Sequence, residues 1–87
     1  MAEFKRIAEK LEAGEAEEVK QLVQAAMDAG VPAADILNQG LLAGMESVGA
    51  KFKVNEIFVP DVIFAARAMT AGLQLLQPKL AAAGVKP

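Results

Sequence analysis

Apolar residues recur along most of this chain at intervals of three and four positions, which is the period of one face of an α-helix. The clearest series lies in the middle of the sequence and consists of Leu37, Leu41, Met45, Val48 and Phe52. A second long series follows Pro60 and consists of Val62, Ala66, Met69, Leu73, Leu76 and Leu80. The two series predict long helices over about 32–52 and 60–80 that meet at a short junction.

The first thirty residues repeat this pattern in two shorter segments, which predict helices over about 2–13 and 15–29. Their apolar positions are Phe4, Ile7, Ala8 and Leu11 in the first segment and Val19, Leu22, Val23 and Ala26 in the second. Gly14 ends the first helix, because the residue after a last helical turn often needs a positive φ. Gly30 closes the second helix, and Pro32 begins the third, where its missing N–H costs nothing.

Four amphipathic helices joined by short connections predict an all-α protein, and they close most simply into an antiparallel four-helix bundle. No segment alternates apolar and polar residues as a half-buried strand does. At 1.5 Å per residue the third and fourth helices measure about 30 Å, whereas the first two measure about 15 to 23 Å. The long pair should therefore extend beyond the short pair by about one or two turns. If this overhang falls at the junction between the two long helices, Phe52 and Val59 project past the cover of the short helices.

Three glycines inside the third helix indicate close packing. Gly40, Gly44 and Gly49 each cost up to about 1 kcal/mol relative to Ala in a helix interior. Gly40 and Gly44 lie four positions apart beside the apolar stripe. We interpret them as the place where the backbone of a neighbouring helix approaches, with a ligand contact as the alternative.

The C-terminal part of the chain predicts a domain boundary. Pro78 removes one backbone hydrogen bond and should kink or end the regular part of the fourth helix. Small residues with Gly84 and Pro87 follow, a composition typical of a linker. We therefore expect one domain over residues 1–80 and a linker-like tail over residues 81–87.

The junction between the two long helices carries large apolar residues where a connecting loop should be polar. They are Phe52, Ile57, Phe58 and Val59. If they project beyond the short helices, they form a patch that marks a binding surface or a dimer contact. The alternative is that Phe52 completes the core and Val59 packs as a hydrophobic staple at the start of the fourth helix. Val62 fits either the core or the patch, and the sequence does not decide where Phe58 points.

Composition excludes several classes of function. The chain has no His and no Cys. Disulfides, thiol chemistry, imidazole catalysis and the commonest zinc sites are therefore excluded. Its net charge is −2 and its basic residues are dispersed, which argues against nucleic acid as a partner. No apolar run reaches about 18 residues, so we expect a cytoplasmic protein without a membrane partner.

The charged residues favour structural roles over catalytic ones. Glu15, Glu17 and Glu18 lie at the start of the second helix, where they complement its dipole. Glu46 and Arg67 are candidates for an ion pair between the third and fourth helices. No nucleophile lies near a base, and no phosphate loop or paired-carboxylate motif is present. We therefore expect that the chain is not an enzyme by itself.

The series GLLAGMESVGAKF, then NEIFVPDVIFAARAM, then LQP, resembles the helical cap domain of corrinoid proteins. That family includes the corrinoid subunits of methyltransferases and cobalamin-dependent methionine synthase. The resemblance spans nearly the whole chain, and the combination of Gly-Met, Val-Gly, Phe, Val-Pro and Ala-Met at these spacings is specific.

The resemblance implies a four-helix cap over the upper, methyl-bearing face of a cobalamin or other corrinoid. By that resemblance Phe52, Val59 and Val62 contact the ring, and their apolar side chains keep water from the reactive cobalt. The family's next domain, an α/β cobalamin-binding domain whose Asp-x-His-x-x-Gly motif supplies the lower cobalt ligand, is absent from this chain. The implied partners are a corrinoid held by such a domain and methyltransferase subunits of one-carbon metabolism.

A hypothesis from another class is a helical interaction or dimerisation module that uses no cofactor. In that case the junction patch pairs with another protein or with a second copy of the chain. The two hypotheses predict the same exposed residues, so a binding experiment with methylcobalamin separates them.

Overall fold

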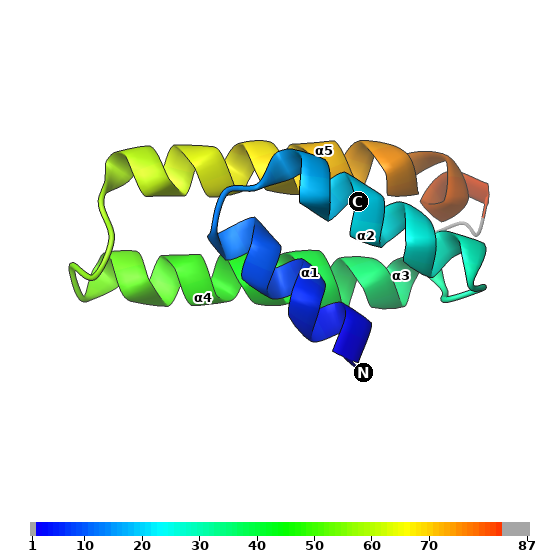
Figure 1. Ribbon diagram of the computed structural model, residues 1–87, viewed down its shortest axis with the longest axis horizontal. Helices are drawn as coiled ribbons and strands as arrows, with labels where there is room; N and C mark the ends of the chain where they lie inside the picture. Colours follow the sequence, from blue (N-terminus) through cyan, green and yellow to red (C-terminus); the bar gives the residue numbers. More distant parts are fainter. Residues whose placement is uncertain (1, 83–87) are drawn as a thin grey trace.

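The computed structural model describes residues 2–82, and all the regular structure within them is helical. The elements are α1 (Ala2–Glu12), α2 (Ala16–Asp28), α3 (Ala33–Asp35), the π-helix η1 (Ile36–Leu41), α4 (Leu42–Lys53) and α5 (Val59–Ala82). The segments α3, η1 and α4 form one continuous rod, so the fold has four rods, as Figure 1 shows. The predicted all-α, four-helix fold is confirmed.

The four rods pack in two pairs of different length. The rod that ends with α4 runs antiparallel to α5, α2 packs along α5, and α1 crosses η1 and α4 (Figure 1). The molecule measures 38 × 24 × 20 Å along its principal axes. Its core is formed by Phe4, Ile7, Leu11, Val19, Val23, Ala26, Ile36, Leu41, Val48, Ala65, Ala68, Leu76 and Leu80. Every rod therefore contributes to one core.

The turn between α1 and α2 depends on Gly14, which adopts the predicted positive φ of 73°. The N–H groups of Gly14 and Glu15 donate to the carbonyls of Leu11 and Lys10, at 2.9 and 3.0 Å, and so satisfy the free end of α1. A Cβ atom at position 14 would lie 2.7 Å from Cβ of Phe64 on α5. Glycine is therefore required here both by its backbone conformation and by the closeness of α5.

The third rod differs from the uninterrupted α-helix that the sequence predicts over 32–52. Its residues Ile36–Leu41 form a π-helix, in which the backbone bonds span five residues instead of four. The wider turn allows Ile36, Gly40 and Leu41 all to face the core. Regular α-helical spacing would turn one of the adjacent residues Gly40 and Leu41 away, which is why a simple period of 3.6 did not reveal this segment.

The predicted close approach at Gly40 and Gly44 is confirmed, and the helix that approaches is α1. A Cβ atom at Gly44 would lie 3.1 Å from both the Cα atom and the carbonyl oxygen of Ala8. A Cβ atom at Gly40 would lie 3.1 Å from the side chain of Ile7. These two glycines therefore let α1 sit directly on the third rod, whereas a Cβ at Gly49 would meet nothing within 4 Å.

The buried face of α5 agrees with the predicted stripe at Leu76 and Leu80 but is rotated from it over the first half of the helix. The residues that face the core are Ala65, Ala68, Gly72, Leu76 and Leu80. Ala66, expected in the stripe, is exposed, and the predicted Met69 and Leu73 are half-buried at its edge. The physical reason is close packing: a Cβ atom at Gly72 would lie 2.9 Å from Leu41 and 3.1 Å from Val19, so small residues take the centre of the face.

The helix α5 continues through Pro78 to Ala82, past the predicted end near residue 80. The rest of the predicted tail, residues 83–87, lies outside the described part of the chain. By length and composition α5 could cross a membrane, since the mean hydropathy of its best 18-residue window is 1.2. Length and composition do not separate a membrane span from the core helix of a bundle, and one face of α5 lies in this core.

Candidate functional site

The exposed large apolar residues of the described chain gather at one end of the molecule. All of them except Leu42 lie between residues 52 and 64, and they are Phe52, Val54, Phe58, Val59, Ile63 and Phe64, which we call the junction patch. Figure 1 shows the α4–α5 turn beyond the ends of both α1 and α2. The predicted overhang is therefore present, and it lies at the junction end, which the sequence left open.

Two polar residues hold the turn that carries the patch. Asn55 has a φ of 63°, and the N–H groups of Asn55 and Glu56 donate to the carbonyls of Phe52 and Lys51, at 3.1 and 2.8 Å. This arrangement ends α4 with a left-handed residue, a position for which Asn is suited. At the start of α5 the N–H of Phe58 donates to Oδ2 of Asp61 at 2.9 Å, as in half of a capping box. The apolar side chains thus project from a turn fixed at both ends.

The predicted contact residues have the following positions. Phe52, at the end of α4, is 44% exposed, and Val59, the first residue of α5, is 56% exposed. Val62, almost one turn further, is half-buried and packs against the core at the edge of the patch. Neither Phe52 nor Val59 is sealed in the core, so the alternative in which both complete the bundle is not what the structure shows.

The remaining apolar residues of the junction divide between the core and the patch. Phe58, whose direction the sequence left open, is 69% exposed, whereas Ile57 is half-buried against the core. Sequence reasoning missed Val54, Ile63 and Phe64. Val54 lies alone among the polar residues Lys53, Asn55 and Glu56, which hides its apolar character. Ile63 and Phe64 lie outside the stripe that the spacing of the larger residues of α5 indicates.

The candidate ion pair between Glu46 and Arg67 is not formed. The ion pairs formed within residues 2–82 do not include Glu46 with Arg67. The guanidinium of Arg67 instead lies 5.8 Å from the ring centroid of Phe64, within the range of a cation–π contact. Both partners are exposed, so this contact adds little to stability but keeps the cation beside the apolar surface.

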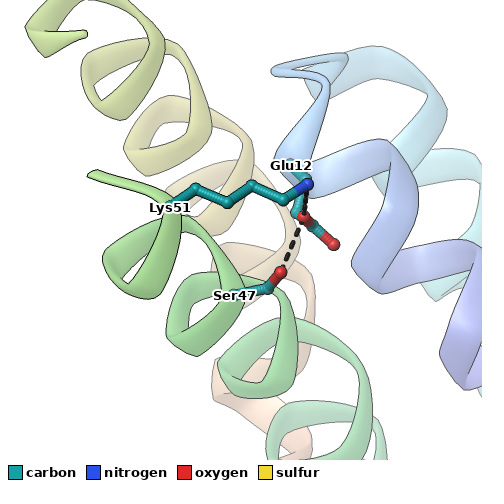
Figure 2. A network of polar contacts seen from close by, with 3 residues as sticks. All are labelled: Glu12, Ser47 and Lys51. Atoms are coloured by element: carbon teal, nitrogen blue, oxygen red, sulfur yellow. Dashed lines mark hydrogen bonds and ion pairs between the residues drawn. The ribbon is translucent and has the colours of Figure 1, made fainter. Parts of the chain in front are cut away.

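The polar network closest to the patch joins α1 to α4 (Figure 2). One oxygen of Glu12, Oε1, accepts hydrogen bonds from Oγ of Ser47 at 2.8 Å and from Nζ of Lys51 at 2.7 Å. Partial burial raises the pKa of Glu12, but the hydrogen bonds from Lys51 and Ser47 and the charge of Lys51 outweigh it, so the pKa lies below its ordinary value. The same bond raises the pKa of Lys51.

The chemistry of the patch is apolar. Its side chains are aromatic or aliphatic, and they project from a turn that is held by hydrogen bonds at both ends. Residues 2–82 contain no cluster of three His, Cys, Asp or Glu side chains that could hold a metal ion, and the whole sequence has no His. The patch therefore offers apolar contact.

Comparison with known proteins gives this surface its context. A sequence profile described as "B12 binding domain" matches residues 3–77. Monomethylamine corrinoid protein 2 of Methanosarcina acetivorans is 45% identical over 60 residues, which are 69% of this chain and 28% of that protein. A corrinoid protein of Desulfitobacterium hafniense is 39% identical over 72 residues, which are 83% of this chain and 33% of that protein.

A solved structure agrees with these matches. The monomethylamine corrinoid protein of Methanosarcina barkeri superimposes on this chain with a TM-score of 0.88 at 34% identity. The superposition covers 91% of this chain and 37% of the other. The fold and the exposed end thus define a helical cap domain of the corrinoid-protein type. The chain belongs to the B12-binding domain family, as its sequence motifs indicated, and it spans about a third of the length of these relatives.

Proposed function

We propose that this chain covers the upper, methyl-bearing face of a protein-bound corrinoid, with Phe52, Val59 and Val62 in contact with the ring. The observation that carries the proposal is the junction patch: large apolar side chains left bare on a rigid turn at the end of the bundle. When bound, the corrinoid supplies methyl transfer at its cobalt. The chain's own part is to exclude water by apolar contact.

The geometry supports this role without any catalytic group. Phe52 and Val59 stand on opposite sides of the α4–α5 turn, and Val62 follows on the side of α5 that borders the core. Leaving a large apolar side chain in water forgoes roughly 1.5 to 3 kcal/mol of burial, so several at one end favour a surface that is covered in use. In this proposal the chain is the non-catalytic part of a methyltransferase system.

The partners follow from the same proposal. The ring is held from below by an α/β cobalamin-binding domain, which supplies the ligand that this chain lacks. Methyltransferase subunits reach the methyl group when the cap is displaced, and the cytoplasm is the compartment we assign. The relatives named for monomethylamine support a place in one-carbon metabolism, while the methyl donor depends on the separate methyltransferase.

The test uses methylcobalamin and a pair of matched variants. The chain is mixed with methylcobalamin, alone and together with the α/β domain of a related corrinoid protein, and the visible spectrum and photolysis rate are recorded. We expect the parent chain to change the spectrum and slow photolysis, and Phe52→Ala to weaken both effects. Phe64→Ala is the control, because Phe64 is similarly exposed but lies on another side of α5, next to Gly14.

Two results would count against the proposal. A parent chain that changes neither the spectrum nor the photolysis rate in either mixture favours the interaction module, whose patch pairs with a protein. Equal losses in Phe52→Ala and Phe64→Ala would indicate unspecific adhesion of the ring to an apolar surface.

A further inference from the structure

The patch is attached to the rest of the fold at one polar point. Glu12, in the last turn of α1, binds Ser47 and Lys51 of α4, and Figure 2 shows the three side chains converging between the two helices. Although all three are polar, the Glu12 side chain is only 20% exposed, compared with 45% for Lys51. The carboxylate is thus held in a partly dry position where its hydrogen bonds are stronger than in water.

This network is the end of a longer contact line between α1 and α4. Ile7 faces Gly40, Ala8 faces Gly44, and Glu12 then reaches Ser47 and Lys51, which lie further along the same rod. α1 ends at Glu12, so this is its last helical residue beside α4, and Phe52 of the patch follows Lys51 directly.

The last turn of α1, which carries Glu12, also contacts α2. Nζ of Lys10, in the same turn of α1, lies 3.2 Å from Oε2 of Glu15 and 3.3 Å from Oε2 of Glu18. The last turn of α1 is therefore tied to α2 by Lys10 and to α4 by Glu12. A displacement of α4 away from Glu12 cannot be followed easily by α1.

The stretch of α4 that the network spans has low helix propensity, although the N–H groups of Val54 and Glu56 close its end by donating to the carbonyls of Ala50 and Lys51. Ser47 and Lys51 are one helical turn apart, and Gly49 lies between them, where a Cβ atom would meet nothing within 4 Å. Gly49 and Ala50 are exposed, and glycine lowers helix stability at this point. Helix ends fray first, so without the network α4 should open from Gly49 onward and carry Phe52 with it.

We propose that Glu12 is a positioning residue for the junction patch: by binding Ser47 and Lys51 it bridges the weak turn at Gly49 and fixes the direction of Phe52. It also draws the Lys51 ammonium toward α1. That the ordered Phe52 meets a corrinoid depends on the proposed function, but the ordering itself does not.

Amide hydrogen exchange of the intact chain tests the ordering. We expect Glu12→Ala, and as a second variant Lys51→Met, to accelerate exchange of the amides at residues 52–54 by about tenfold, the effect of losing a charged hydrogen bond. Amides at the opposite end of the bundle, such as those of Gly30 and Val31, should change by less than about twofold in the same variants, because their local opening leaves the network intact. Core amides that exchange only through global unfolding accelerate with the loss of overall stability. Glu15→Gln is the matched control, because it breaks an ion pair of α1 that does not involve α4.

A rescue separates positioning from general stabilisation. Gly49→Ala should restore protection of residues 52–54 in the Glu12→Ala background, because it strengthens the same helical turn by another route. Unchanged exchange at residues 52–54 in Glu12→Ala, or an equal acceleration at Gly30 and Val31, overturns the proposal. So does a Gly49→Ala rescue that raises overall stability and leaves residues 52–54 unprotected.

The methylcobalamin assay then connects the ordering to the proposed function. Glu12→Ala should weaken the spectral change, although less than Phe52→Ala, and Gly49→Ala should restore it. A parent chain that gives no spectral change contradicts the proposed function alone, since the exchange measurements decide the role of Glu12 independently.

Discussion

The third rod and α5 run side by side, and their covered and uncovered parts have different surfaces. The covered part lies under α1 and α2, and the uncovered part is the end that carries the junction patch. Where α1 and α2 cover the pair, the contacts are so close that Gly40, Gly44 and Gly72 leave no room for a Cβ without displacement of a neighbour. Where the cover ends, phenylalanine and β-branched side chains are exposed, as at Phe58 and Val59. Glycines thus lie at the closest helix contacts, whereas the uncovered end carries large apolar side chains that are about half exposed or more.

This contrast indicates that the uncovered end is shaped for contact outside the bundle. Scattered exposed apolar residues are normal on a protein surface, but a contiguous group rimmed by charges marks a binding site. Lys51, Lys53 and Glu56 surround the turn and are exposed, so the apolar group has a polar rim. The covered half holds the core, and the uncovered half is the surface that the proposed function assigns to binding.

The largest expected effect compares one residue from each half. Leu41→Ala removes a fully buried side chain and should lower the free energy of unfolding by about 2 to 5 kcal/mol. Phe52→Ala removes a larger side chain that is already 44% exposed and should lower it by less than about 1 kcal/mol. Urea denaturation followed by circular dichroism measures both. Similar losses for the two variants would mean that Phe52 belongs to the core.

Two glycines of α4 allow a second comparison, in which the same substitution, Gly→Ala, is made at a covered and at an uncovered position. Gly49→Ala adds a methyl group in open space and should stabilise the protein by up to about 1 kcal/mol through helix propensity. Gly44→Ala adds the same group 3.1 Å from the backbone of Ala8 and should destabilise it by about 1 kcal/mol, because α1 must move away. Thermal unfolding of both variants gives the order. Stabilisation by Gly44→Ala would show that α1 shifts without cost.

The fold could be predicted from sequence because helical periodicity, glycine and proline positions and helix lengths are all local properties. Gly14 and the pair Gly40 and Gly44 illustrate this, since positive φ and close approach each demand glycine. The π-helix at Ile36–Leu41 could not be predicted, because it is a tertiary adjustment that brings Gly40 and Leu41 to the core together. The face of α5 was misplaced for a related reason: close packing selects small residues, whereas periodicity arguments give more weight to large ones.

The patch was predictable in place and only partly in extent. Apolar residues in a loop at the end of the longest helices point to exposure, which held for Phe52 and Val59 but not for Ile57. Phe58, whose direction the sequence left open, is also exposed. The residues that fix the turn could have been recognised, since Asn55 after the helix and Asp61 in the first turn of the next are common capping signals. The link from Glu12 to Lys51 joins positions 39 apart, so no local pattern could reveal it.

A third prediction concerns the isolated chain with its patch uncovered. The isolated chain should self-associate weakly. Burial of a phenylalanine side chain stabilises an association by roughly 1.5 to 3 kcal/mol, so Phe58→Ser should weaken it by about tenfold or more. Phe58 is suitable because it is 69% exposed and its substitution leaves the core untouched. Sedimentation velocity over a range of concentrations measures the change. A monomer at high concentration in the parent chain would contradict an adhesive patch.

The smallest expected effect is the pH dependence of the Glu12 network. The pKa of the Glu12 carboxyl group is lower in the folded protein than its ordinary value. Glu12 therefore contributes fully to stability above its ordinary pKa, and this contribution disappears as pH falls through the lower, folded pKa. Lys51 has a raised pKa, so its contribution persists below its ordinary pKa and disappears only in alkali, as pH rises through the folded value. The network should therefore act between about pH 5 and pH 10.

Unfolding measured at pH 7 and pH 3 in the parent and in Glu12→Ala isolates this contribution. The parent should lose about 1 kcal/mol more than the variant on acidification, a value reduced by the partial exposure of the carboxylate. The nearby charges, Glu9 beside Glu12 and Glu56 near Lys51, are common to both proteins and cancel in the difference. Because the network holds the end of α4, the protection of amides 52–54 relative to their intrinsic exchange rate at each pH should fall on acidification in the parent alone. If the parent and Glu12→Ala lose the same stability and the same protection at residues 52–54 on acidification, Glu12 does not order the patch.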